Sequence, residues 1–329
     1  MNSPARIVRG NPANLARLAR RLRAGELVAV PTETVYGLAA NALDARACRK
    51  IFTAKGRPAN DPLIVHIHSL AQLGEVAEVN AAALKLAKKF WPGPLTLVLP
   101  KKSVVPAVVS AGLPSVAVRM PSHPLFRRLL KLTGLPLAAP SANPFGYVSP
   151  TSAEHVRAGL GRKIRYILDG GSCTIGLEST IVDLRDPRRP VLLRPGAVTR
   201  AELQRTLGVR VRLATAKAKS GAQLAPGLLA RHYSPRTPVT LHARLSPAAA
   251  TRSPASEAWV FLAQPGKLRG KNIFRLDARG ELPGVARRLF ATLRRVDTLG
   301  FTRIHVELAR GEGLAAAIND RLRRASAAG

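Results

Sequence analysis

The feature that most constrains the fold is the run from Leu63 to Ile67, which reads LIVHI. Its apolar residues are consecutive and rich in β-branched side chains, so the run lacks helical spacing and is typical of a buried strand. Asp61 and Pro62 stand directly before it and interrupt any preceding helix. A short, fully apolar strand of this kind favours an α/β architecture, in which helices cover the sheet.

Two cations, Lys55 and Arg57, precede this strand, at the exit of a helix that Asp44 is placed to cap. Ligands of open α/β sheets bind beside strand ends, so we expect both cations near a ligand. A point charge next to a forked guanidinium suits an anion, above all the phosphates of a nucleotide. A solvated basic turn gives the same pattern, so these two residues alone do not decide between the readings.

Composition sets the remaining limits. The chain has 329 residues, of which 46% are hydrophobic and 4% aromatic, so it can bury two largely aliphatic cores. A formal net charge of +33 favours polyanions such as nucleotides or RNA, although a general compositional bias gives the same excess. Cys48 and Cys173 have neither metal-ligand nor disulfide spacing. The N-terminal residues lack a signal-peptide pattern, and no apolar run is long enough to span a bilayer. We therefore expect a cytoplasmic protein that does not bind membranes.

The predicted elements divide the chain into two domains and a linker. In residues 1–207, strands follow one another without a helix between each pair, which predicts a twisted mixed sheet packed by helices. Residues 238–329 alternate between strand and helix, which predicts a small doubly wound, Rossmann-like α/β domain without a GxGxxG dinucleotide motif. Residues 208–237 have little apolar periodicity and are interpreted as a linker. The fold class is therefore α/β, with α+β character in the first domain.

Several segments in order resemble one family. They are PTETVYGLAANA, KGRPANDPLIVHI, WPGPLTLVLP, VAVRMP, PSANPFGYVSPT, GLESTIVDL and LLRPGAV, followed by PG-LLA-RHYSP and, near the end, GLAAAINDRLRRA. The chain resembles the threonylcarbamoyl-AMP synthases of the two-domain type, in which a YrdC-like domain precedes a smaller C-terminal domain. The resemblance covers nearly the whole chain. The sequence departs from the family pattern at Leu228, Leu229 and Ala230, where Met, Lys and an aromatic residue are usual. The absence of the Lys removes a cation from the linker.

The resemblance implies a reaction in two steps. The amino group of L-threonine takes up bicarbonate or CO2 to give a carbamate, and the carbamate then attacks the α-phosphate of ATP, releasing pyrophosphate. The product, threonylcarbamoyl-AMP, passes to proteins that transfer the threonylcarbamoyl group to tRNA. Mg2+, held mainly by the ATP phosphates, is the implied cofactor, and the residues indicate no metal site of the protein's own.

The resemblance also implies roles for individual residues. The shared catalytic tetrad is Lys55, Arg57, Ser141 and Asn143. The ATP-binding residues are these four together with Asp61, Ser115, Ser149, Arg194 and Tyr233. The residues expected to bind L-threonine are Thr34, His66, Arg119, Ala139 and Thr180. The linker segment HYSP, from His232 to Pro235, is the candidate lid over ATP; the alternative is that Arg231 to Pro235 only anchors one domain to the other.

Two other functions stay open at this level. An RNA-binding protein that holds double-stranded RNA or tRNA would show a steep loss of affinity with salt and no ATP turnover. The sequence has no aromatic stacking run of the kind that reads RNA sequence. Carbamoyl transfer in hydrogenase maturation uses a similar domain, but there the chains carry Cys-rich zinc motifs, which this sequence lacks.

Overall fold

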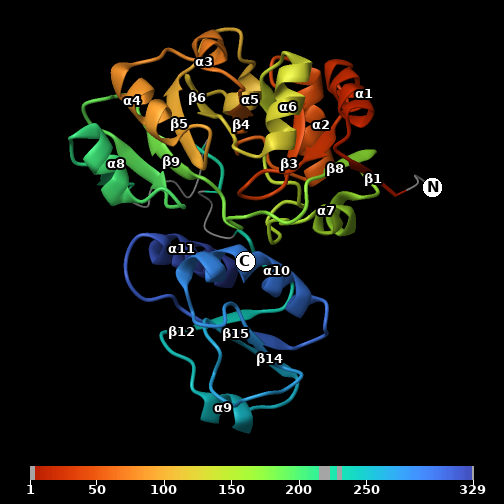
Figure 1. Cartoon of the computed structure of the whole chain (residues 1–329), viewed down its shortest axis with the longest axis vertical. Helices are drawn as coiled ribbons and strands as arrows, with labels where there is room; N and C mark the ends of the chain where they lie inside the picture. The colour runs from red at the N-terminus through yellow and green to blue at the C-terminus, as the bar shows by residue number, and fades with distance from the viewer. Residues whose placement is uncertain (1–3, 215–222, 228–231, 328–329) are drawn as a thin grey trace.

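The computed structural model describes residues 4–214, 223–227 and 232–327. Two α/β bodies lie one above the other along the long axis, and the chain crosses between them once (Figure 1). The larger body contains strands β1–β11 and helices α1–α8, and its sheet carries the candidate site.

Within the described residues, eleven strands form one mixed sheet. In spatial order they are β1 (Arg6–Arg9), β8 (Tyr166–Asp169), β2 (Val28–Val30), β3 (Gly37–Asn41), β7 (Leu137–Ala138), β4 (Ile64–His66), β6 (Ser115–Arg119), β5 (Leu95–Pro100), β9 (Thr180–Asp183), β10 (Val191–Arg194) and β11 (Arg212–Leu213). The central pair β4 and β6 is parallel, and His66 lies beside Arg119 in register. Their carboxyl ends therefore meet at one edge, and these two side chains lie side by side.

Helices cover both faces of this sheet. They are α1 (Pro12–Arg23), α2 (Ala45–Lys55), α3 (Leu70–Val76), α4 (Ala81–Phe90), α5 (Ala107–Ser110), α6 (Pro124–Thr133), α7 (Ala153–Leu160) and α8 (Arg200–Leu207). Helices α1 and α6 pack together on one face, over β2, β7 and β8, while α2, α4 and α7 contribute to the core on the other face. Alternate strand residues belong to alternate cores, as the pleat requires: Val28 faces α1, and Ala29 faces the opposite side.

Local sequence explains where α2 begins and ends. The Asp44 side chain accepts the backbone N–H groups of Arg46 and Ala47 at 2.8 and 3.2 Å, which caps the first turn as expected. Gly56 adopts the left-handed conformation with φ of 63°, which closes the last turn. Lys55 is the last residue of this helix and is buried, so its ammonium group is directed into the domain.

The smaller body is a parallel sheet with the order β12 (Val239–His242), β15 (Arg303–Glu307), β13 (Glu257–Phe261) and β14 (Ile273–Arg275). Its remaining elements are α9 (Pro247–Arg252), α10 (Leu282–Asp297) and α11 (Leu314–Ser326). Helices α10 and α11 share a core with Val260 and Ile304, whereas α9 packs with Trp259 on the opposite face. This doubly wound arrangement agrees with the predicted Rossmann-like α/β domain.

Helices α10 and α11 face the larger body (Figure 1). Arg294 of α10 donates to the carbonyl of Val148 at 2.5 Å, and Tyr147 donates to the carboxylate of Asp297 at 2.7 Å. The backbones also approach closely at Gly176, where a Cβ atom would lie 2.6 Å from the backbone of Arg287. The interface therefore combines these polar contacts with apolar packing, since Val35, Val148 and Leu177 of the larger body belong to the same buried cluster as residues of α10 and α11.

The mixed sheet and the doubly wound domain were predicted, but several strands were not. Strand β3 reads GLAAN, which has no β-branched residue, and β11 is two exposed residues inside the range interpreted as linker. Strand β11 pairs with β10, so residues up to Leu213 belong to the larger sheet. Cys48 and Cys173 are buried free thiols. Among the described residues, no helix is both long and apolar enough to cross a bilayer.

Candidate active site

A small cavity lies at the carboxyl edge of β4 and β6, and the linker covers it. Its volume is about 40 Å³. Eight residues expected to bind substrates line it: Thr34, Arg57, His66, Arg119, Ala139, Ser141, Arg194 and Tyr233. They come from segments that are distant in the sequence, so the fold brings together most of the predicted site.

Arg119 organises one end of the cavity. Its guanidinium donates to the hydroxyl of Thr34 at 2.9 Å and to the carbonyl of Gly93 at 3.1 Å, and it forms an ion pair with Glu33 at 2.7 Å. Arg119 is buried, with only 3% of its surface exposed. Burial opposes ionisation of Glu33, but the charge and hydrogen bond of Arg119 hold its pKa below the ordinary value. The pair is therefore charged on both sides.

His66 lies beside this ion pair and is neutral. Burial, reinforced by the positive charge of Arg119, lowers the pKa of His66 to about 3. One ring face packs on Phe126 with a centroid distance of 5.4 Å. Its Nδ1 atom has no hydrogen-bond partner within the part of the chain that is described. A buried, unpaired nitrogen in a cavity wall is a place where a ligand can donate or accept a hydrogen bond.

Lys55 lies beneath the cavity wall and does not line it. Its ammonium donates to the carbonyls of Ser141 at 2.6 Å and of Asn143 at 2.5 Å. Burial, together with the nearby charge of Arg57, lowers the pKa of Lys55 well below its ordinary value. The amide nitrogen of Asn143 donates to the carbonyls of Pro144 and Tyr147. Lys55 thus orders the loop that presents Ser141 to the cavity.

Arg57 reaches the cavity from the loop before β4. It donates to the carbonyls of Asp61 at 2.9 Å and Pro62 at 2.6 Å, and it forms an ion pair with the Asp61 carboxylate at 2.9 Å. Burial raises the pKa of Asp61, an effect that Arg57 opposes. Asp61 is itself outside the cavity lining, so its contact with a ligand is indirect, through Arg57.

Arg194, at the end of β10, organises the other end. It donates through Nε to the carbonyl of Ser179 at 3.1 Å, through Nη2 to the Ser179 hydroxyl at 3.2 Å, and through Nη1 to the carbonyl of Pro226 at 3.1 Å. Ser179 lines the cavity, whereas the neighbouring Thr180 does not. The Thr180 hydroxyl donates to the carbonyl of Val198 at 2.7 Å, on the other side of the strand.

The linker forms the roof. Pro226, Gly227, His232 and Tyr233 all line the cavity. Tyr233 has a positive φ of 62°, and its buried hydroxyl has no hydrogen-bond partner among the residues that can be described. Burial raises the pKa of Tyr233 to about 12, so the phenol is protonated. Gly227 is required there, because a Cβ atom would lie 2.5 Å from the Tyr233 hydroxyl. Leu228, Leu229, Ala230 and Arg231, which belong to the predicted lid motif, lie outside the described residues.

Six predicted residues lie outside the cavity lining: Lys55, Asp61, Ser115, Asn143, Ser149 and Thr180. Ser115 begins β6, about 13 Å along the strand from Arg119 at the usual rise per residue. The Ser149 hydroxyl is engaged with Glu178 at 2.5 Å. Direct substrate contact by these six would need a different arrangement from the one seen.

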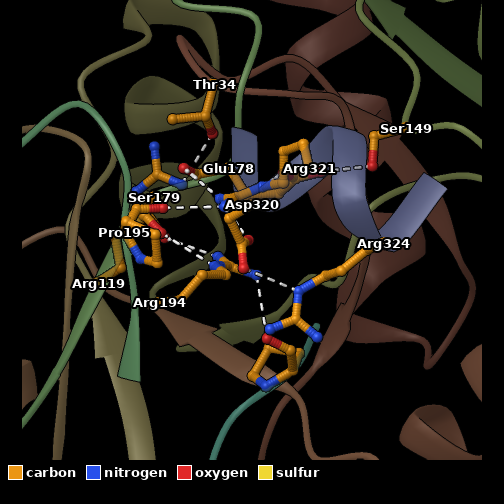
Figure 2. A network of polar contacts seen from close by, with 11 residues as sticks. Thr34, Arg119, Ser149, Glu178, Ser179, Arg194, Pro195, Asp320, Arg321 and Arg324 are labelled. Carbon is orange, nitrogen blue, oxygen red and sulfur yellow. Dashed lines mark hydrogen bonds and ion pairs between the residues drawn. The ribbon is translucent and has the colours of Figure 1, made fainter. Parts of the chain in front are cut away.

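Sequence reasoning assigned no role to several residues, among them Glu33, Glu178, Ser179 and Arg321, of which Glu178 and Ser179 line the cavity. Figure 2 shows that Arg321 comes from α11 of the smaller body and meets Glu178 beside Ser179 and Arg194. The acidic residues follow directly on predicted motifs, PTET and GLEST, so their position was a usable signal. No local pattern distinguishes Arg321 from its neighbours.

A metal site made by the protein is not evident. Among the described residues, no group of three or more His, Cys, Asp or Glu side chains is arranged to hold a metal ion. Glu178, an acid in the cavity wall, already binds Ser149 and Arg321. The donor set is dominated by cations, so the site suits anionic substrates and does not fit a resident metal ion.

An α/β sheet with buried cations and hydroxyls around one closed cavity at its strand ends defines an enzyme that acts on small anionic substrates. Residues 20–196 match a family model described as "Telomere recombination", and residues 198–327 match one described as "Threonylcarbamoyl-AMP synthase, C-terminal domain". The chain belongs to the threonylcarbamoyl-AMP synthase family, whose members are nucleotidyltransferase-type enzymes.

Individual relatives agree with this assignment. The threonylcarbamoyl-AMP synthase of Pyrococcus abyssi is 45% identical over 316 residues, covering 93% of this chain and 92% of that protein. The Bacillus subtilis enzyme of the same name is 45% identical over 234 residues, covering 70% and 67%. The crystal structure of Pyrococcus abyssi Sua5 complexed with L-threonine superposes with a TM-score of 0.90 at 41% identity, covering 98% of both chains.

Proposed function

We propose that the protein forms threonylcarbamoyl-AMP and pyrophosphate from L-threonine, bicarbonate or CO2, and ATP. The observation that carries this proposal is the single cavity bounded by Arg119, Thr34 and His66 at one end and by Arg57, Ser141 and Arg194 at the other. The first end is a compact polar pocket, which suits L-threonine, and the second is a cationic wall, which suits the phosphates of ATP. The names of the relatives at 45% identity support the same reaction.

The end around Arg119 suits L-threonine. Two N–H groups of the guanidinium remain after its contacts with Thr34, Glu33 and Gly93, and a fork of this kind binds a carboxylate. Thr34 and the unpaired Nδ1 of His66 can hydrogen-bond the hydroxyl or amino group of the substrate. Ala139 adds a small apolar wall. A buried polar pocket of this kind disfavours an amino acid without the hydroxyl, because its own groups would be left unpaired.

The end around Arg194 and Arg57 suits the phosphates of ATP. In the first step the unprotonated threonine nitrogen bonds to the carbon of CO2 or bicarbonate, giving a carbamate; with CO2 a proton is released, and with bicarbonate water is released. In the second step a carbamate oxygen bonds to the α-phosphorus, and the bond from that phosphorus to pyrophosphate breaks. Such a transfer needs alignment and charge neutralisation more than covalent help. Ser141, presented by the loop that Lys55 orders, is placed to hydrogen-bond a nucleotide oxygen.

Magnesium enters this proposal only as a companion of the nucleotide. Mg2+ prefers oxygen ligands and commonly binds through substrate phosphates. Since the described residues do not fit a resident ion, we assign it no protein ligand and no step.

The linker acts as a lid in this proposal. Drug-sized ligands occupy pockets of roughly 300–1,000 Å³, whereas the cavity measures about 40 Å³ with Pro226, Gly227 and Tyr233 over it. The roof therefore has to move outward to admit ATP and threonine. A labile carbamate benefits from a site that then excludes water. After the lid closes over the bound nucleotide, the unpaired Tyr233 hydroxyl is available to hydrogen-bond it.

The remaining partners follow from the product. We propose that threonylcarbamoyl-AMP is delivered to proteins that modify tRNA, in the cytoplasm. Direct tRNA or RNA binding is compatible with the net charge of +33 but has no specific observation in its favour, and an RNA-binding protein without ATP turnover does not account for the enclosed cavity.

The test is substrate-dependent release of pyrophosphate. The purified protein, supplied with ATP, Mg2+ and bicarbonate, should release pyrophosphate only when L-threonine is added, and L-serine or L-valine should substitute poorly. Pyrophosphate release that is indifferent to threonine would count against the proposal. Strong RNA binding with no ATP consumption would favour the RNA-binding alternative.

A further inference from the structure

Arg321 is a buried cation of the smaller body that works outside its own domain. It lies on α11, is 1% exposed, and extends its guanidinium into the larger body (Figure 2). Nε donates to the Glu178 carboxylate at 2.8 Å, Nη1 to the carbonyl of Pro195 at 3.0 Å, and Nη2 to the carbonyl of Glu178 at 3.3 Å. One planar group therefore joins two loops of the catalytic domain.

Those two loops carry the cationic wall of the cavity. Glu178 precedes Ser179, and Pro195 follows Arg194. Arg194 in turn donates to both the carbonyl and the hydroxyl of Ser179. Arg321, which lies outside the cavity lining, thus fixes the distance between the two loops. It thereby also fixes the direction of the Arg194 guanidinium. A lysine lacks the planar fork, so it would not hold the three acceptors in this geometry.

The same side chain also touches the roof of the cavity. The Arg321 guanidinium carbon lies 5.4 Å from the centre of the Tyr233 ring, which stacks on Phe290 of α10 on a centroid distance of 5.5 Å. The second oxygen of Glu178 accepts the Ser149 hydroxyl at 2.5 Å. Burial lowers the pKa of Arg321, but Tyr233, Glu178 and Asp320 together raise it above the ordinary value, so the group is charged.

We propose that Arg321 is a positioning residue for the nucleotide end of the site, and that the smaller body serves catalysis by supplying it. The inference rests on the proposed function, since it assigns Arg194 and Tyr233 to ATP. Arg321 does not touch substrate in this arrangement; it acts by holding Glu178 and the loop of Pro195 so that Arg194 meets the phosphates. The threonine end, around Arg119, has no contact with it.

Arg321→Lys tests this assignment by comparing the binding of two ligands. Calorimetry with a non-hydrolysable ATP analogue should show the dissociation constant raised by about tenfold, which is near the lower limit for one charged hydrogen bond. The dissociation constant for L-threonine should stay within about twofold, as expected for a site without shared contacts. Loss of domain docking alone would weaken both ligands or neither, so equal changes, or none, would overturn the proposal.

Arg294→Lys is the matched control. Arg294 is also buried at 6% exposure, lies on the neighbouring α10, and crosses the same interface to the carbonyls of Val148, Ser149 and His155. Like Arg321 it lies outside the cavity lining, but its acceptors are on the loop of Val148 and on α7, and not at Glu178 or Pro195. We expect Arg294→Lys to lower the melting temperature to a similar degree without the selective loss of the ATP analogue. If it reproduces that loss, the effect belongs to the interface as a whole and the assignment to Arg321 is wrong.

Glu178→Gln keeps the inference testable if Arg321→Lys does not fold. It retains the shape of the side chain but removes the charge that Arg321 holds, so it should weaken the ATP analogue in the same direction. When both variants fold, their effects should not add in the double variant, because each breaks the same contact. Additive effects would refute the coupling. Wild-type pyrophosphate release decides the proposed function separately, since analogue binding needs no turnover.

Discussion

Removal of Arg119 should separate its role in threonine binding from its role in stability. Arg119→Met removes the guanidinium that binds Thr34, Gly93 and Glu33, and it leaves the Glu33 carboxylate buried at 5% exposure without its ion-pair partner. Loss of one partner of a buried ion pair destabilises a protein by about 3–5 kcal/mol. Loss of a charged hydrogen bond to threonine removes about 1.5–3 kcal/mol of binding free energy, roughly 10- to 150-fold in affinity.

A second substitution distinguishes the two effects. Glu33→Gln, added to Arg119→Met, removes the stranded charge, so most of the lost unfolding free energy should return. Threonine affinity should not return, because the fork that binds the carboxylate is still absent. Chemical denaturation measures the first quantity and calorimetry with L-threonine the second, while binding of an ATP analogue serves as the internal reference. A double variant that binds threonine like the wild type, or a single variant that loses both ligands equally, would refute the reasoning.

Three further predictions concern the loop, the roof and the neutral histidine. Lys55→Met should lower the unfolding free energy by about 2–4 kcal/mol and slow single-turnover pyrophosphate release, since the carbonyls of Ser141 and Asn143 lose their charged donor; full retained turnover would remove Lys55 from the site. Tyr233→Phe should be at least as stable as the wild type, because it deletes a buried unpaired hydroxyl, yet raise the KM for ATP; an unchanged KM would leave the phenol without a role. The pKa of His66 in the folded protein, about 3, lies below its value near 6.5 in the unfolded chain. The neutral histidine therefore contributes fully to the free energy of unfolding above pH 6.5. This contribution falls by about 1.4 kcal/mol per pH unit as the pH drops towards 3. Denaturation at pH 7.5 and 5.5 should therefore show a smaller pH effect in His66→Asn, and an equal effect would contradict the assignment.

The sequence predicts the parts of this site that depend on strand ends and local turns. Lys55 and Arg57 were expected beside the mouth of the strand at Ile64–His66, and they lie there because Gly56 ends α2 and Pro62 begins the extended segment. The family motifs likewise place Arg119 and Ser141 in one cavity with Arg57. What the motifs do not give is the direction of each side chain.

The step from Ser179 to Thr180 shows why. Neighbouring residues of a strand point to opposite faces, so of two adjacent side chains one points into the cavity and the other into the core. The motif GLEST contains both hydroxyls, but only Ser179 lines the cavity, and Thr180 binds the carbonyl of Val198 instead. Arg321 is harder still to predict, because its partner Glu178 is 143 positions away and only the docking of the two bodies brings them together.

In the proposed function, the distribution of acids around the cavity distinguishes the ends assigned to the two substrates. Arg119, at the threonine end, is neutralised by Glu33, which suits a zwitterionic amino acid whose net charge is zero. Arg194 and Lys55, at the nucleotide end, donate to carbonyl and hydroxyl oxygens that carry no charge. Two acids, Asp61 and Glu178, also lie at this end, but they form ion pairs with Arg57 and Arg321 and not with Arg194 or Lys55, so positive charge remains available for a triphosphate. Burial lowers the pKa of both Lys55 and Arg194, and a bound polyanion would raise each pKa again.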